Sequence, residues 1–213
     1  MRDAMDDLVK DWDSFLAPYY QAVEELKLKL KTIRKEYQQN GSHTPIEFVT
    51  GRVKSKDSIL EKMEVRNILP EDFLFGVQDI GGIRIMCQFV EDIYEVAELL
   101  KNRQDFKVIL IRDYIDKPKE SGYRSYHLII DYPVQRAHEM VSVIIEIQIR
   151  TLAMNFWATI EHSLNYKYQG EYPEHILLRL ERASEAAFQL DKEMSEIREE
   201  IREATHYFEK RYD

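Results

Sequence analysis

Two acidic residues in the middle of the chain have the types and positions that metal-assisted chemistry needs. Asp79 lies just before an expected strand, and Glu146 lies among isoleucines in the centre of another. An unpaired carboxylate is costly to bury, so Glu146 requires a partner. A Mg²⁺ ion shared by the two carboxylates would meet this need, because Mg²⁺ prefers oxygen ligands. An ordinary salt bridge to Arg84 or Arg150 is the alternative, and the pattern leaves both open.

A group of basic residues precedes Asp79 in the chain. Arg52 and Lys54 lie at a junction between a turn and a helix, and Lys62 and Arg66 follow on that helix. Free backbone amides and basic side chains at such a junction can hold an anion together. A solvated basic helix face would have the same composition. This spacing alone is therefore a weak indication of an anion site.

The segment from Asp113 to His127 brings cations, hydroxyl groups, aromatic rings and a histidine into one connection between two strands. Lys119 and Arg124 can meet phosphates, and Tyr123 can offer a flat face to a nucleotide base. A solvated polar loop is the alternative, but a connection that only joins two strands has little use for this composition. The segment therefore favours a nucleotide-binding loop.

The last polar group runs from a strand into a helix expected over 151–168. On the strand, Glu146, Gln148 and Arg150 share one face, because side chains alternate between the two faces of a sheet. The helix carries a polar stripe beside an apolar stripe that we expect to be buried. The polar stripe consists of Asn155, Thr159, His162 and Tyr166, and the apolar stripe of Leu152, Phe156, Ile160 and Leu164.

These groups must be positioned by a strand-rich middle that helices flank. β-branched and aromatic residues indicate strands over 82–90, 106–114, 125–132 and 141–150. Apolar periodicity indicates helices over 12–40, 55–65 and 91–103, and 44–54 is typical of a turn followed by a short extended piece. Together these elements predict an α+β protein.

A long C-terminal helix is expected over 173–211, with an apolar residue at alternating steps of three and four. This seam consists of Ile176, Leu180, Ala183, Ala187, Leu190, Met194, Ile197, Ile201, Ala204 and Phe208. A seam of this length seeks a partner helix. The N-terminal helix carries a similar repeat, so the two ends are expected to pack together, to mediate oligomerisation, or to do both.

Composition limits the classes of function. The 213 residues carry a formal net charge of −9, which argues against broad electrostatic binding of nucleic acid but not against a local phosphate site. A single cysteine, Cys87, excludes an internal disulfide framework and favours a reducing compartment. Since neither a signal sequence nor a membrane-spanning run is recognisable, we expect a soluble cytoplasmic protein.

Four stretches of the chain resemble the synthetase domain of the RelA/SpoT family, and specifically the small alarmone synthetases of the RelQ type. They are residues 45–54, 78–86, 113–127 and 146–168. Larger relatives add a hydrolase domain with a His-Asp motif, and no His-Asp dipeptide occurs in this sequence. The resemblance implies one synthetase domain over 1–213, with a catalytic core at 44–170 and no hydrolase domain.

The resemblance further implies a mixed sheet flanked by helices, similar to nucleotidyltransferases. It implies transfer of pyrophosphate from ATP to the 3′-hydroxyl of GTP or GDP, with release of AMP and formation of the stringent-response alarmones ppGpp and pppGpp. Glu146 would act as the base, and Asp79 and Glu146 would bind Mg²⁺. ATP would be held by Arg52, Lys54, Ser58, Lys62, Arg66 and Arg84. The guanosine nucleotide would be held by Lys119, Tyr123, Arg124, His127, Gln148, Asn155, Glu161 and His162.

Enzymes of the RelQ type are homotetramers with an allosteric nucleotide site in a cleft between subunits, so both properties are implied for this chain. Lys27, Lys31, Phe48 and Thr50 are the positional candidates for contacts with allosteric (p)ppGpp. Two other functions stay open at this point. One is a nucleotidyltransferase that releases pyrophosphate, and the other is a regulator that binds single-stranded RNA. A purely structural helical scaffold is a poorer explanation of so many polar residues.

Overall fold

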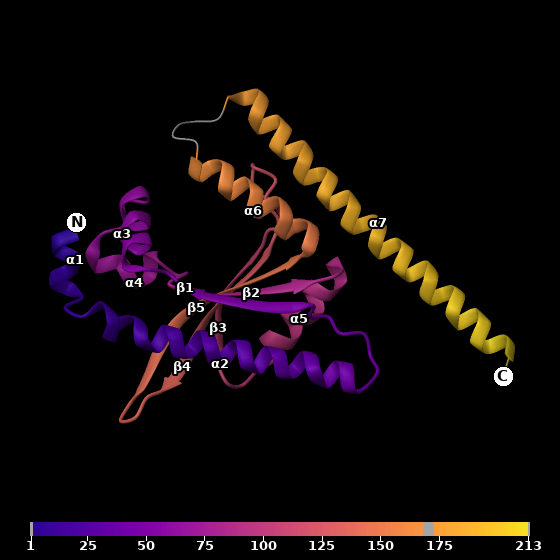
Figure 1. Cartoon of the computed structure of the whole chain (residues 1–213), viewed down its shortest axis with the longest axis horizontal. Helices are drawn as coiled ribbons and strands as arrows, with labels where there is room; N and C mark the ends of the chain where they lie inside the picture. The colour runs from indigo at the N-terminus through magenta and orange to yellow at the C-terminus, as the bar shows by residue number, and fades with distance from the viewer. Residues whose placement is uncertain (1, 168–172, 213) are drawn as a thin grey trace.

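The computed structural model describes residues 2–167 and 173–212, and its centre is a mixed sheet of five strands (Figure 1). The strands are β1 (Phe48–Val53), β2 (Gly81–Cys87), β3 (Lys107–Asp113), β4 (Tyr126–Gln135) and β5 (Met140–Thr151). Their order is β1-β2-β5-β4-β3, with β2 parallel to β5 and the other neighbours antiparallel. The α+β class with a mixed sheet is therefore confirmed.

Helices lie on both sides of this sheet. They are α1 (Arg2–Leu8), α2 (Trp12–Gln39), α3 (Lys56–Val65), α4 (Phe73–Gly76), α5 (Val90–Lys101), α6 (Leu152–Lys167) and α7 (Glu174–Tyr212), with a 3-10 turn at Pro70–Asp72. In Figure 1, α2 crosses one side of the sheet while α6 and α7 lie on the other, and α7 extends beyond the remaining elements. Both long terminal helices match their predicted bounds within two residues.

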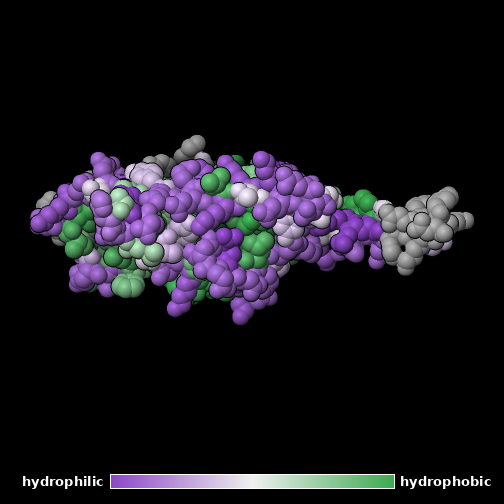
Figure 2. Space-filling model, turned by 90° about the horizontal axis from the view of Figure 1, so that it is seen from below, coloured by the Kyte–Doolittle hydropathy of each residue, from purple (hydrophilic) through white to green (hydrophobic). Residues whose placement is uncertain are grey.

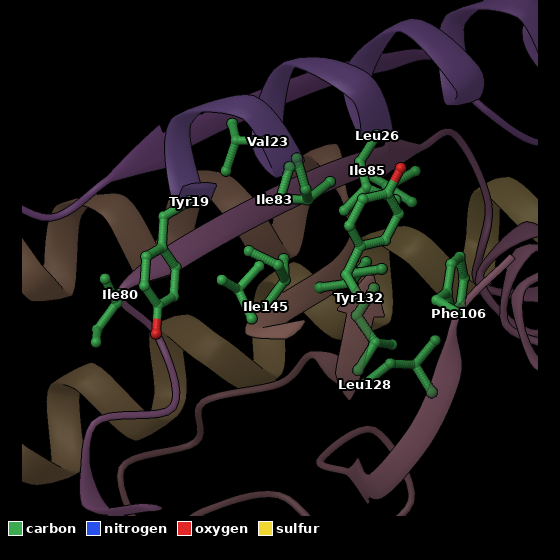
Figure 3. Close-up of a cluster of buried hydrophobic side chains, with 14 of the residues drawn as sticks. Tyr19, Val23, Leu26, Ile80, Ile83, Ile85, Phe106, Leu128, Tyr132 and Ile145 are labelled. Carbon is green, nitrogen blue, oxygen red and sulfur yellow. The ribbon is translucent and has the colours of Figure 1, made fainter. Parts of the chain in front are cut away.

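The main core lies between α2 and the sheet. Side chains of α2 such as Tyr19, Val23 and Leu26 point onto Ile83 of β2 and Ile145 of β5 (Figure 3). All five are buried, and each fully buried aliphatic or aromatic side chain contributes about 1.5–3 kcal/mol. Because residues alternate along a strand, this apolar face leaves the opposite face of the sheet for polar residues.

The C-terminal helix does not dock on the core through its predicted apolar seam. Most of that seam is exposed, including Leu190 at 55% and Ile201 at 61%. The contacts come instead from the residues one position later, which we call the docking stripe: Ser184, Phe188, Asp191, Ser195 and Arg198. Of the alternatives left open by the sequence, packing of the whole seam within the chain is therefore not observed, because periodicity locates an apolar stripe but not what covers it.

The apolar stripe of α6 was also assigned to the wrong environment. Leu152, Phe156, Ile160 and Leu164 are exposed, with Phe156 at 70%, while Met154, Trp157 and Ala158 are the buried residues of this helix. Trp157 donates from Nε1 to the carbonyl of Leu180 and so joins α6 to α7 (3.0 Å). The side chains of Tyr166 and Phe208 lie outside those that the structure describes.

Two further observations concern the surface. Figure 2 shows a largely hydrophilic face in which apolar side chains form separate patches, some of them on the projecting part of α7. Within the described ranges, no helix is both long enough and apolar enough to span a bilayer.

Candidate functional site

The pairing of the strands places several predicted site residues, together with Gly82 and Arg112, in two adjacent rows on the polar face of the sheet. One row runs across four strands and consists of Arg84, Gln148, His127 and Arg112. The next row contains Arg52, Gly82 and Glu146. Residues that pair directly across strands have their side chains on the same face. The sheet thus brings together side chains that lie up to 96 positions apart in the chain, from Arg52 to Gln148.

Glu146 is held by two donors from neighbouring positions. Nδ1 of His127 lies 3.1 Å from one carboxylate oxygen, and Nε2 of Gln148 donates to the other at 2.8 Å. Burial alone would raise the pKa of Glu146, but these hydrogen bonds and the charge of Lys62 outweigh it and lower the pKa to about 2. Glu146 is therefore ionised, and the salt bridge to Arg84 or Arg150 that the sequence left open is not formed.

Asp79 precedes β2 by two residues and is bound by two lysines. Nζ of Lys62 donates to Oδ1 at 2.6 Å, and Nζ of Lys54 lies 3.4 Å from Oδ2. Burial lowers the pKa of Lys62, whereas Asp79 raises it. Since the Lys62 charge also lowers the pKa of Glu146, this ammonium group acts electrostatically on both carboxylates.

Arg150 is the origin of a hydrogen-bond network that ends at Glu146. Its Nη2 atom donates to the hydroxyl of Tyr123 and, at 2.8 Å, to Oε1 of Gln148. The Tyr123 hydroxyl lies 2.8 Å from Nε2 of His127. With His127 donating from Nδ1 to the ionised carboxylate, Nε2 must accept from Tyr123. Two arms, one through Tyr123 and His127 and one through Gln148, therefore reach the two oxygens of Glu146.

The loop residues Lys119 and Tyr123 lie together beside this network. Nζ of Lys119 is 4.8 Å from the centre of the Tyr123 ring and 4.9 Å from that of Tyr114, which are distances typical of cation–π contacts. Burial, and next the charge of Arg66, lowers the pKa of Lys119, while Glu146 and Glu161 raise it. The predicted nucleotide-binding loop thus contributes a cation and an aromatic ring to the polar face.

Three buried polar atoms have no hydrogen-bond partner in the described part of the chain. They are Nε of Arg84 on this face, Oδ1 of Asn155 on α6 and Nε of Arg124. Burial, and then repulsion from Arg150 and Arg52, lowers the pKa of Arg84. Buried polar atoms normally have hydrogen-bond partners, so these atoms are the expected contacts of a ligand. A ligand that satisfies this many cations must carry several negative charges.

The register also leaves space for such a ligand. Gly82 lies between Arg52 and Glu146, and a Cβ atom at this position would meet only two backbone oxygens at 4.0 Å. The absence of a side chain therefore exposes the sheet surface beside the carboxylate. Two surface hollows of about 580 and 700 Å³ lie elsewhere, the first between α5 and α7 and the second beside the start of α2. The candidate site is an open sheet face.

Some predicted residues lie at the margin of this face or away from it. Arg124 turns to α7, where its guanidinium donates to Ser184 and Glu185 at 2.9 and 2.8 Å. Ser58 is on the exposed side of α3, where it contacts Ser55. His162 is exposed on α6. Arg66 and Glu161 are close enough to Lys119 to shift its pKa. The binding roles assigned to all of these residues stay predictions.

Sequence reasoning did not include Arg112 and Arg150 among the site residues. Arg112 pairs with His127 in the sheet and donates to Gln78 at 3.0 Å. Arg150 is 4% exposed, and none of the described carboxylates forms an ion pair with it. The clean alternation of β5 placed Arg150 on the polar face, which was an available signal. Nothing in the sequence indicated that β3 would bring Arg112 beside β4.

The acidic residues are compatible with a divalent cation in number and type. The described residues contain no group of three acidic, histidine or cysteine side chains arranged for a metal. Mg²⁺, however, is commonly held by one or two carboxylates together with substrate phosphates and water. Asp79 and Glu146 supply carboxylate oxygens beside several lysine and arginine side chains, so the donor set fits a metal that arrives with a nucleotide.

Comparisons with known proteins identify the family of this chain. Residues 51–171 match the family described as the region found in RelA/SpoT proteins. The chain is 60% identical over 207 residues to the GTP pyrophosphokinase YjbM of Bacillus subtilis, with 97% of each protein covered.

Solved structures give the same result. The chain superposes on small alarmone synthetase 1 of Bacillus subtilis bound to its product pppGpp with a TM-score of 0.85 and 62% identity, covering 89% of this chain and 97% of that one. The form of that protein bound to AMPCPP gives a TM-score of 0.77 at 56% identity, covering 90% and 98%.

Proposed function

Because the chain belongs to the RelA/SpoT synthetase family, we propose that it is a GTP pyrophosphokinase that makes the alarmones pppGpp and ppGpp. The observation that carries this proposal is the buried, ionised Glu146 on a sheet face whose other charged groups are mostly cations. The related synthetase binds the product pppGpp and the ATP analogue AMPCPP, which supports the same pair of substrates for this chain.

The reaction transfers one proton, forms one bond and breaks one bond, each at a defined atom. The 3′-oxygen of GTP or GDP loses its proton to Glu146 and forms a bond with the β-phosphorus of ATP. The bond from that phosphorus to the bridging α–β oxygen breaks, and AMP leaves with this oxygen. Such transfers depend on in-line positioning and charge neutralisation more than on covalent participation of the protein. Hydrogen bonds from His127 and Gln148 orient the carboxylate for this step.

The two substrates occupy opposite ends of the polar face in this proposal. Arg52 and Arg84 hold the ATP adenine, and Lys54 and Lys62 hold its phosphates, with Ser58 and Arg66 at the margin. The guanine stacks on Tyr123, and its phosphates meet Lys119, with His127, Gln148, Asn155, Glu161 and His162 as further contacts. The unpartnered Nε of Arg84 and Oδ1 of Asn155 support a ligand at each end.

Asp79 and Glu146 are the proposed ligands of Mg²⁺. The bound ion would neutralise charge on the ATP phosphates. Lys62 and Lys54, which bind Asp79, are the cations proposed to hold those phosphates beside the ion. Because both substrates are cytoplasmic nucleotides, the cytoplasm is the proposed place of action.

We further propose that the chain assembles as a homotetramer. The exposed apolar seam of α7 and the exposed apolar stripe of α6 are the surfaces that support assembly, since soluble monomers rarely leave such stripes uncovered. Mass photometry should therefore give about four times the chain mass, and Met194→Lys should reduce it. A stable monomer for the wild type would contradict assembly.

We also propose an effector site around the edge strand β1, where (p)ppGpp would contact Lys27, Lys31, Phe48 and Thr50. Single-stranded RNA is a further proposed ligand of the oligomer.

Product analysis tests the proposed activity. The purified protein is incubated with ATP, Mg²⁺ and GTP, and the products are separated by anion-exchange chromatography and identified by mass. We expect AMP and pppGpp in equal amounts. Release of pyrophosphate without AMP would indicate nucleotidyl transfer instead, and absence of turnover with every guanine nucleotide would reject the synthetase assignment.

A further inference from the structure

The loop that carries Lys119 and Tyr123 ends in a tight turn. The amide of Lys119 donates to the carbonyl of Tyr123 at 3.2 Å, and the amide of Gly122 donates to the carbonyl of Lys119 at 2.8 Å. Gly122 has a φ of +84°, a conformation that residues with a Cβ atom rarely adopt. These contacts fix the turn internally but leave the carbonyl of Gly122 for another partner.

That partner is Ser184 of α7. Its hydroxyl donates to the carbonyl of Gly122 and accepts from Nη1 of Arg124 at 2.9 Å. Ser184 is only 4% exposed, so both hydrogen bonds are shielded from water. The packing is close, because a Cβ atom added to Gly122 would lie 2.7 Å from Cβ of Ser184. The turn therefore rests directly on the C-terminal helix.

Arg124 strengthens this contact on the outer side. Nη2 of Arg124 lies 2.8 Å from Oε2 of Glu185, and its guanidinium lies 4.4 Å from the centre of the Phe188 ring. Nη1 and Nη2 of Arg124 thus bind α7, while the adjacent Tyr123 faces the network around Glu146. Within the chain, α7 lies beyond residues 51–171, the part that matches the family.

We infer that Ser184 is a positioning residue for the guanosine acceptor: by holding Gly122 and Arg124, it fixes the turn that presents Lys119 and Tyr123. The inference rests on the proposed function. It gives α7 a role in substrate recognition in addition to assembly. Since Ser184 touches the turn and not the ATP end of the face, its effect is confined to the acceptor nucleotide.

Ser184→Ala tests this role, with Ser195→Ala as the matched control. Ser195 lies on the same docking stripe and donates to Glu91 of α5 at 2.9 Å, far from the turn. Loss of two shielded hydrogen bonds should raise KM for GTP about tenfold in Ser184→Ala and leave KM for ATP within about twofold. Ser195→Ala should change neither constant by more than about twofold. Amide exchange over residues 119–124 should become faster only in Ser184→Ala.

Glu185→Gln provides a second variant in case Ser184→Ala folds poorly, because Glu185 is exposed and the change removes the charge of the outer ion pair while an amide oxygen can still accept from Gln189. We expect a smaller rise, about two- to threefold, in KM for GTP alone. An unchanged KM for GTP in both variants of an active enzyme would overturn the inference, as would an equal rise in Ser195→Ala. If the wild-type protein itself makes no pppGpp, it is the proposed function that fails.

Discussion

Nδ1 of His127 lies 3.1 Å from Oε1 of Glu146, and this contact joins β4 to β5 at the centre of the polar face. Burial lowers the pKa of His127, so the imidazole is neutral near pH 7 and can donate from one nitrogen only. The Glu146 carboxylate requires that nitrogen to be Nδ1. The histidine thus has a fixed tautomer, and Glu146 keeps its remaining lone pairs for an incoming hydroxyl.

The first prediction concerns the base. Glu146→Gln keeps the size and hydrogen-bonding shape of the side chain but removes the proton acceptor. We expect kcat to fall about a thousandfold, since a positioned general base contributes about 10²–10⁴. The affinity for AMPCPP, measured by calorimetry without turnover, should stay within about threefold because Arg52 and Arg84 are intact. A variant that retains most of its activity would contradict the assignment of Glu146.

The second prediction concerns Arg150. Arg150→Met removes the donor that begins both arms of the network, so kcat should fall roughly 10- to 100-fold with little change in KM. Tyr123→Phe removes one arm and should lower kcat less. The double variant should be little worse than Arg150→Met alone, because the same arm is already lost.

Arg136→Met is the control for this cycle, because Arg136 contacts Gln21 on α2 and not the network. Its kcat should equal that of the wild type. If the factors by which Arg150→Met and Tyr123→Phe lower kcat simply multiply in the double variant, the two residues act independently and the network has no catalytic role.

The polar face could be predicted from the sequence because its signal is local. Alternation along β5 places Glu146, Gln148 and Arg150 on one side without knowledge of any neighbour. The predicted strands also agree with the observed ones within about three residues. The partners of Glu146 could not be predicted, because His127 reaches it only through the pairing of β4 with β5.

The third prediction concerns the left-handed glycines. Gly122→Ala adds a Cβ atom that would lie 2.7 Å from Ser184, and it also strains a φ of +84°. We expect KM for GTP to rise at least tenfold while KM for ATP is unchanged. Gly41→Ala is the control, because Gly41 has a φ of +66° but open space around it. It should lower the unfolding temperature slightly and leave both KM values unaltered; parallel effects in the two variants would point to backbone strain alone.

The fourth prediction concerns Asp191, which accepts a hydrogen bond from Thr151 at 2.6 Å. Burial raises the pKa of Asp191 to about 6 from its ordinary value near 3.8, although Thr151 opposes the shift. The folded state therefore holds a proton that the unfolded state has released between these two values. Stability contributed by this group is present below pH 4 and is lost as the pH rises through 6.

The expected loss between pH 4 and pH 7 is about 2–3 kcal/mol, because a shift of one pKa unit corresponds to about 1.4 kcal/mol. Asp191→Asn should lack this pH-dependent loss. The free energy of unfolding, measured with urea, should therefore be higher for the variant than for the wild type at pH 7, and this difference should be smaller at pH 4. The same difference at both pH values would show that Asp191 does not titrate in this range.

The packing of α6 and α7 could not be predicted from the sequence. Periodicity identified apolar stripes on α6 and α7, but Phe156 and Leu190 on those stripes are exposed. The contacts that dock α7 are polar and come from residues such as Ser184 and Asp191, which no hydrophobic pattern marks. A single sequence describes each helix surface but not the chain that will cover it.

The central claim is that both terminal phosphoryl groups of ATP move together to the guanosine 3′-oxygen on the face around Glu146. Incubation with ATP labelled at the β-phosphorus tests this directly. We predict that the label appears on the 3′-position of the guanosine product while the AMP is unlabelled, and that Glu146→Gln prevents the transfer. Label recovered in free pyrophosphate or in ADP would contradict the account.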